Sequence, residues 1–160
     1  MKKIIIVAMA LFLVASTSDA MAQSMATLRL GGGVITKGSV PGGGLNLTLN
    51  KAESPLALGI TAELYSKSGT RQVPIGVLGM FQKSNESDKV TFFVGAGGGI
   101  ISIKAGGTST KGMATGLAGL PFYFSEKAGV YAKCQFYRAI TSGATNSFSV
   151  GGGIAIALCS

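Results

Sequence analysis

Strict alternation between apolar and polar or small residues runs through most of this chain, and it constrains the fold more than any other feature. The segment 45–50 reads Leu-Asn-Leu-Thr-Leu-Asn, and the segment 56–64 has Leu, Ile or Ala at every second position. The segment 130–137 follows the same rule. A period of two residues puts alternate side chains on opposite faces of a β-strand. The sequence therefore predicts an all-β fold.

Turn-forming residues divide the chain into about eight such segments. The predicted strands span 27–36, 42–50, 55–66, 71–83, 89–104, 111–125, 128–140 and 147–159. Most reach the roughly 9–11 residues that a tilted strand needs to cross a bilayer. An even number of antiparallel strands can close into a ring without an unpaired edge, and a bilayer requires that closure because it offers backbone groups no water. We predict an up-and-down antiparallel transmembrane β-barrel of about eight strands.

The first 22 residues have the pattern of a secretory signal peptide. A basic start at Lys2 and Lys3 precedes an apolar run over 4–15, and a small-x-small sequence ends at Ala22. The apolar run is shorter than the roughly 20 residues of a membrane-spanning helix. We expect cleavage between Ala22 and Gln23, with residues 1–22 as signal peptide and 23–160 as a single exported barrel domain.

Charge is scarce, and it is predominantly basic. Only 12% of the residues are charged, against about 25% in a typical soluble domain, while the formal net charge is +8. For an exported chain, anionic lipid headgroups and lipopolysaccharide phosphates are better partners for this charge than nucleic acid.

The predicted turns are of two kinds that alternate along the chain. The turns over 50–55, 84–89 and 125–127 mix acids with lysines, whereas the other connections contain no acid. Alternate turns of an up-and-down barrel lie at the same end, so one end is expected to be charge-balanced and the other basic. The residues of this predicted basic loop face are Lys37, Lys67, Arg71, Lys104, Lys111 and Arg138.

Aromatic residues concentrate near the charge-balanced turns. They are Phe81, Phe92, Phe93, Phe122, Tyr123, Phe124 and Tyr131. This distribution predicts an aromatic girdle at one membrane interface.

In the alternation of residue types along its strands and in the charges of its turns, the chain resembles the small eight-stranded outer-membrane barrels, the group of OmpX-like and opacity-like proteins. The resemblance covers the signal peptide and nearly all of the remaining chain. It implies localisation in the bacterial outer membrane, with short turns and termini in the periplasm. It also implies that the basic loops face outward, against lipopolysaccharide phosphates.

Three charged residues occupy strand positions whose side chains are predicted to face into the barrel. They are Arg29, Glu63 and Lys133. A charge inside a lipid-embedded barrel requires a partner. One hypothesis is a structural ion-pair cluster in the lumen around Glu63. The alternative is a solvated carboxylate at the rim.

The sequence gives little support for catalysis or cofactor binding. It contains no histidine, which excludes Ser-His and Cys-His dyads and the usual zinc ligand sets. The run 95–100 is close to a dinucleotide-binding fingerprint but lacks its final glycine and a following helix. Glycine triplets in the strands are better explained by curvature and by rings packing on bare backbone. Cys134 and Cys159 fall on opposite faces, and a hairpin about 141–146 would place Cys134 opposite a residue near Gly153, so we expect two free thiols rather than a disulfide.

We therefore expect a non-enzymatic integral outer-membrane barrel, monomeric or weakly oligomeric, with a structural or surface-interaction role. No cofactor, metal or small-molecule substrate is indicated. Two alternatives remain open, namely a small ion or solute channel and a secreted soluble β-sandwich or adhesive subunit.

Overall fold

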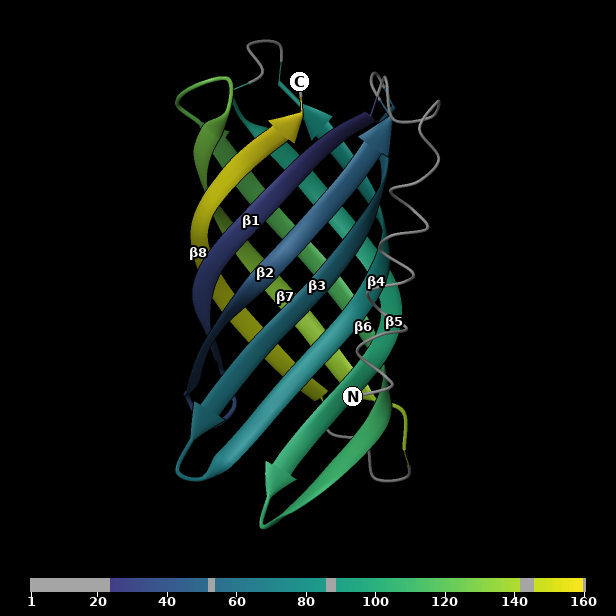
Figure 1. Cartoon of the computed structure of the whole chain (residues 1–160), viewed down its shortest axis with the longest axis vertical. Coiled ribbons are helices and arrows are strands. Elements are labelled where there is room, and N and C mark those ends of the chain that lie inside the picture. Colours follow the sequence, from purple (N-terminus) through teal and green to yellow (C-terminus); the bar gives the residue numbers. More distant parts are fainter. Residues whose placement is uncertain (1–23, 52–53, 86–88, 142–145, 160) are drawn as a thin grey trace.

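The computed structural model, which describes residues 24–51, 54–85, 89–141 and 146–159, is a closed barrel of antiparallel strands (Figure 1). Each strand pairs with the next, and β8 pairs with β1. The strands are β1 (Ser24–Ile35), β2 (Val40–Lys51), β3 (Leu56–Lys67), β4 (Thr70–Ser84), β5 (Thr91–Ala105), β6 (Gly107–Tyr123), β7 (Ala128–Ala139) and β8 (Asn146–Cys159). The predicted fold class is confirmed, and two stacked open sheets are excluded. The expected cleavage site at Ala22 and Gln23 lies outside the described residues.

Two hairpins show how local sequence fixes the register. Ser68 and Gly69 have φ values of 49° and 80° and connect β3 to β4 in a two-residue turn that matches the twist of the strands. Gly106, with a φ of 77°, connects β5 to β6 by itself. The predicted start of the sixth strand at 111 was therefore too late. Strand pairing extends down to Gly107 because a single left-handed glycine reverses the chain.

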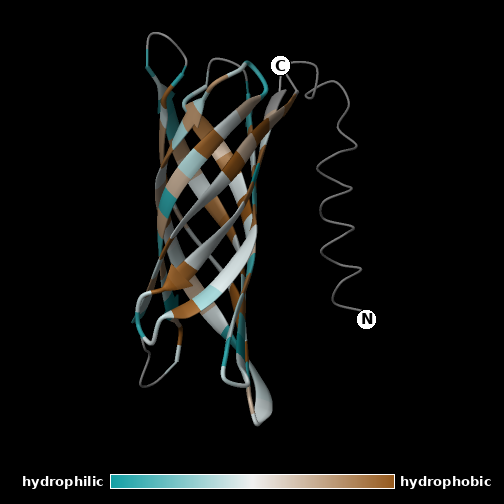
Figure 2. Cartoon of the chain, turned by 90° about the vertical axis from the view of Figure 1, so that its left-hand side faces the viewer, coloured by the Kyte–Doolittle hydropathy of each residue, from teal (hydrophilic) through white to brown (hydrophobic). Residues whose placement is uncertain are grey.

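The outer face of the barrel is apolar, as the alternation predicts. Figure 2 shows hydrophobic residues along the strands, and large side chains such as Leu58, Val77 and Val150 are 40–52% exposed. A continuous apolar exterior of this kind requires hydrocarbon or a partner around it. Among the described residues, no helix is long and apolar enough to cross a membrane.

Much of the lumen is filled by the barrel's own side chains, and a cavity remains at one end. One apolar cluster lies toward the β4–β5 turn and consists of Leu78, Met80, Phe93 and Leu117. The other lies toward the β1–β2 turn and consists of Ile35, Tyr65, Ile101, Met113 and Tyr137. Buried polar side chains of β1, β2, β3, β6 and β7 line the lumen beside these clusters. A barrel of eight strands is narrow enough for side chains to fill it in this way.

Only some residues of the predicted aromatic girdle have side chains that face outward. Phe81, Phe92, Phe122 and Phe124 are 42–67% exposed near the charge-balanced turns. Phe93 and Tyr131, by contrast, are 1% and 5% exposed and face inward. Tyr123 also lines an internal cavity. The distance of a residue from a turn determines where along the barrel axis its side chain lies. The alternation of side chains along the strand determines whether it faces the lipid or the lumen.

Inward glycines make room for the large side chains of the lumen. A Cβ on Gly42 would lie 2.3 Å from Cδ1 of Tyr65, and one on Gly31 would lie 2.6 Å from the Tyr131 hydroxyl. A Cβ on Gly119 would lie 2.4 Å from Cζ of Phe93. The expected packing of rings on bare backbone is therefore present.

Candidate functional site

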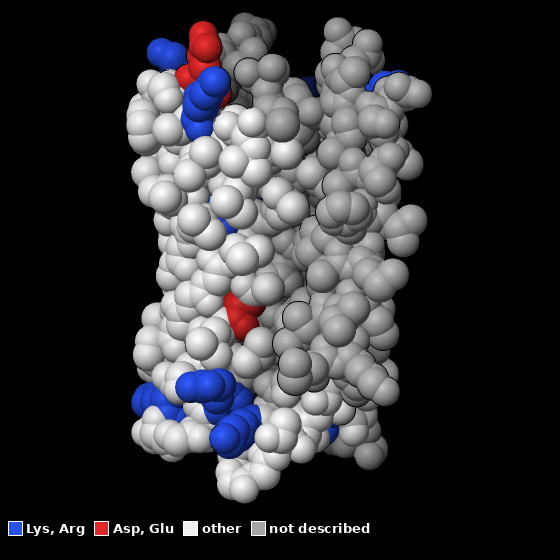
Figure 3. Space-filling view, viewed as in Figure 1, with Lys and Arg blue, Asp and Glu red and all other residues white. Residues whose placement is uncertain are grey.

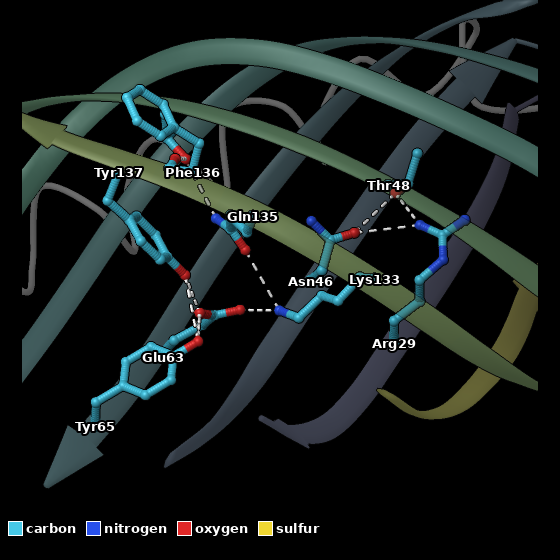
Figure 4. Close-up of polar contacts among 10 residues, drawn as sticks. Arg29, Asn46, Thr48, Glu63, Tyr65, Lys133, Gln135, Phe136 and Tyr137 are labelled. Atoms are coloured by element: carbon cyan, nitrogen blue, oxygen red, sulfur yellow. Dashed lines mark hydrogen bonds and ion pairs between the residues drawn. The ribbon is translucent and has the colours of Figure 1, made fainter. Parts of the chain in front are cut away.

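The central polar group of the lumen is built around Glu63 of β3 (Figure 4). Its Oε1 forms an ion pair with Nζ of Lys133 on β7. Its Oε2 accepts hydrogen bonds from the hydroxyls of Tyr65, at 2.6 Å, and of Tyr137. The Glu63 and Lys133 side chains are 2% and 8% exposed. Glu63 is therefore a buried carboxylate with three donors, and not a solvated carboxylate at the rim.

The backbone pairing between β3 and β4 is interrupted beside Glu63. The β3–β4 register pairs Ala62 with Ile75 and then resumes at Tyr65 with Gln72. Pro74 lies in the unpaired interval, and proline has no N–H to contribute to a strand ladder. The polar network around the carboxylate thus lies where the local backbone ladder is interrupted.

The Glu63 group extends across β7 to β6. Lys133 donates to Oε1 of Gln135 at 3.4 Å, and the Gln135 amide donates to the hydroxyl of Thr115 at 3.3 Å. That hydroxyl donates to the Phe136 carbonyl at 3.0 Å. Hydrogen bonds among polar groups in a low-dielectric lumen fix a single arrangement of the side chains.

Arg29 of β1 forms a second group on the neighbouring strands. Its Nη1 donates to Oδ1 of Asn46 at 3.2 Å and to the hydroxyl of Thr48 at 2.6 Å. The guanidinium carbon lies 4.4 Å from the ring centroid of Phe93, which is within cation–π range. Arg29 thus binds polar uncharged partners and does not join the Glu63–Lys133 pair, although the sequence grouped all three residues.

The alternation of residue types in the sequence already placed Asn46 and Thr48 on the polar face of their strand. Tyr65, Gln135 and Tyr137 also fall on the inward parity, but nothing in the sequence indicates which strands meet across the lumen. The contact between β3 and β7 spans 70 residues and depends on closure of the ring.

The basic residues predicted for one end of the barrel lie at that end. We call Lys37, Lys67, Arg71, Lys104, Lys111 and Arg138 the basic rim. All are exposed except Lys111, which is half-buried, and Figure 3 shows blue side chains gathered at the lower end. Nζ of Lys67 donates to the Gly38 carbonyl at 2.5 Å, which ties two adjacent hairpins together. We call the opposite end, where the chain passes from β2 to β3, from β4 to β5 and from β6 to β7, the mixed-charge end.

Two further observations bear on reactive groups. Cys134 is a free thiol that faces outward, and its Cα partner on β8 is Val150. Within the ranges that the structure describes, no three His, Cys, Asp or Glu residues gather into a group that could hold a metal ion.

A closed eight-stranded ring with an apolar exterior, and with buried polar groups in a narrow lumen, defines the small membrane-barrel class, and solved structures of that class superpose on the chain. The N-terminal β-barrel domain of Pseudomonas aeruginosa OprF matches with a TM-score of 0.65 and 14% identity, covering 85% of this chain and 98% of that one. Neisserial surface protein A matches with a TM-score of 0.57 and 15% identity, covering 83% and 94%. The outer membrane enzyme PagL matches with a TM-score of 0.50 and 12% identity, covering 83% and 98%.

The chain therefore has the fold of the small eight-stranded outer-membrane β-barrels, as its resemblance to them predicted. No protein-family model matches the sequence, and no curated protein does. At these identities the likeness defines the fold and leaves the role to be argued from the residues.

Proposed function

We propose that the protein is a non-enzymatic integral barrel of the bacterial outer membrane whose basic rim binds the phosphates of lipopolysaccharide. The exterior supports the membrane part of the proposal. Apolar side chains such as Leu58 and Val77 are about half exposed, and hydrocarbon removes the cost of leaving them in water.

The different charges of the two ends support the proposal that the basic rim binds lipopolysaccharide. The basic rim contains six cations, Lys37 in a connection and five on strands near that end, and the connections at that end contain no acid. The mixed-charge end instead has Glu126 beside Lys127. Cations near an anionic surface contribute roughly 1 kcal/mol each. A single-sign rim is thus suited to a phosphate-bearing leaflet, with the mixed-charge end in the periplasm.

The residues argue against catalysis. The sequence has no histidine to activate a nucleophile, and the buried carboxylate of Glu63 is saturated by Lys133 and two tyrosine hydroxyls. PagL is an enzyme with a similar fold, but a shared fold does not transfer an activity.

Fractionation with a gel of boiled and unboiled samples tests the membrane part. The folded barrel should sediment with the outer membrane and migrate differently before heating. Because buried side chains block the middle of the lumen, planar bilayers containing the protein should show no discrete conductance steps. Discrete openings would favour the channel alternative.

Lipopolysaccharide binding is tested with a triple variant of the basic rim, Lys67→Gln/Arg71→Gln/Lys104→Gln. A matched control removes three exposed cations of the mixed-charge end, Lys51→Gln/Lys89→Gln/Lys127→Gln.

Binding to lipopolysaccharide and to its dephosphorylated form is measured on each folded variant. At roughly 1 kcal/mol per cation, the rim variant should lose about a hundredfold in affinity for the phosphorylated form. The control should lose much less, and equal losses in the two variants would refute a role specific to the rim.

A further inference from the structure

A cavity of about 670 Å³ lies inside the barrel at the mixed-charge end. Its walls come from β1, β2, β4, β5, β6 and β8, and turn residues such as Ser54 and Ser125 contribute to its edge. It is therefore the mouth of the lumen, opposite the basic rim. Its volume falls within the range of about 300–1,000 Å³ that is typical of small-molecule sites.

Arg29 lines this cavity as a charge without a counter-ion. Its residue exposure is 1%, and Nη1 is held by Asn46 and Thr48. Its Nε has no hydrogen-bond partner among the described residues, and no carboxylate among them pairs with it. An uncompensated buried charge is costly, and an anion in the cavity would remove that cost.

Most of the remaining lining residues have polar side chains. Thr27, Asn50 and Gln82 offer hydroxyl and amide groups. Lys83 borders the cavity but has the outward parity of Phe81, and Glu126 contributes one exposed acid at the edge, so Arg29 is the cation that faces the interior. Guanidinium groups bind carboxylates and phosphates through charge-assisted hydrogen bonds. The walls thus suit an anion that also carries hydroxyl or amide groups.

We propose that the mouth cavity binds a small hydrophilic anion, a carboxylate or a phosphate, through Arg29. The stacking of the guanidinium on Phe93 and its bonds to Asn46 and Thr48 hold it in place before the ligand arrives. This site lies at the opposite end from the basic rim and is independent of lipopolysaccharide binding there.

The test uses NMR of the folded barrel in non-ionic detergent at constant ionic strength. The probes are gluconate, a hydroxylated carboxylate, and inorganic phosphate, with glucose as the uncharged control. Saturable shifts at the Arg29 Nε–H and at the Thr27 and Asn50 amides are expected with either anion and absent with glucose. Binding of only one anion supports the proposal and assigns the ligand to carboxylates or to phosphates.

Three variants complete the test. Arg29→Gln should weaken binding at least tenfold, and Ala157→Leu should do the same by filling the cavity while leaving Arg29 and its bonds in place. Arg71→Gln, which removes a cation of the basic rim, should leave binding unchanged. The proposal is overturned if shifts do not saturate, if glucose produces them equally, or if Ala157→Leu binds like the unmodified barrel.

Discussion

Replacing Glu63 by glutamine keeps the side chain's shape and removes its charge, which leaves the Lys133 ammonium in the lumen without a counter-ion. With side-chain exposures of 2% and 8%, neither group can turn to bulk water for solvation. Removing one partner of a buried ion pair typically costs about 3–5 kcal/mol. Gln135 remains 3.4 Å from the ammonium, and the new amide oxygen still accepts a hydrogen bond. We therefore expect a loss near the lower limit, about 3 kcal/mol.

The assay is denaturant unfolding of the barrel in non-ionic detergent, followed by the gel shift between folded and unfolded forms. The double variant Glu63→Gln/Lys133→Met removes both charges and should recover much of the loss, because no unpaired charge remains in the lumen. Glu126→Gln, which neutralises an exposed acid at the mixed-charge end, serves as the control. A free energy of unfolding for Glu63→Gln within about 0.5 kcal/mol of the unmodified barrel would refute the reasoning.

Other substitutions test packing, membrane contact and the second polar group. Gly42→Ala places a Cβ 2.3 Å from the Tyr65 ring and should cost about 1–3 kcal/mol in the same unfolding assay. The matched variant Gly79→Ala meets nothing within 4 Å, so equal losses at the two glycines would contradict the packing argument. Val77→Arg, at an outward position that is 50% exposed, should cost about 2–4 kcal/mol in lipid vesicles, and a neutral result would mean that this face does not contact hydrocarbon. Thr48→Val removes an acceptor 2.6 Å from the buried guanidinium and should lower the free energy of unfolding by about 1–3 kcal/mol, whereas an unchanged denaturation midpoint would show that this bond is dispensable.

Much of the architecture follows from the sequence because its causes are local. The alternation in segments such as 45–50 assigns side chains to two faces, and the structure buries Asn46 and Thr48 while Leu45 faces outward. Turn residues such as Ser68 and Gly69 set where hairpins reverse. The separation of charge between the two ends follows from alternate turns sharing an end. Each of these features depends on neighbours within a few residues.

The lumen depends on closure of the ring, which no local pattern specifies. The sequence identified Arg29, Glu63 and Lys133 as inward charges, but only the three-dimensional arrangement separates Arg29 from the ion pair and gives it Asn46 and Thr48. Whether an inward side chain meets a partner depends on strand tilt and on the stagger of the whole sheet. The mouth cavity has the same origin, since six strands contribute its walls. The sequence therefore determined the barrel and its two faces, while the tertiary structure decided which inward groups meet, because pairing across the lumen is set by the geometry of the complete ring.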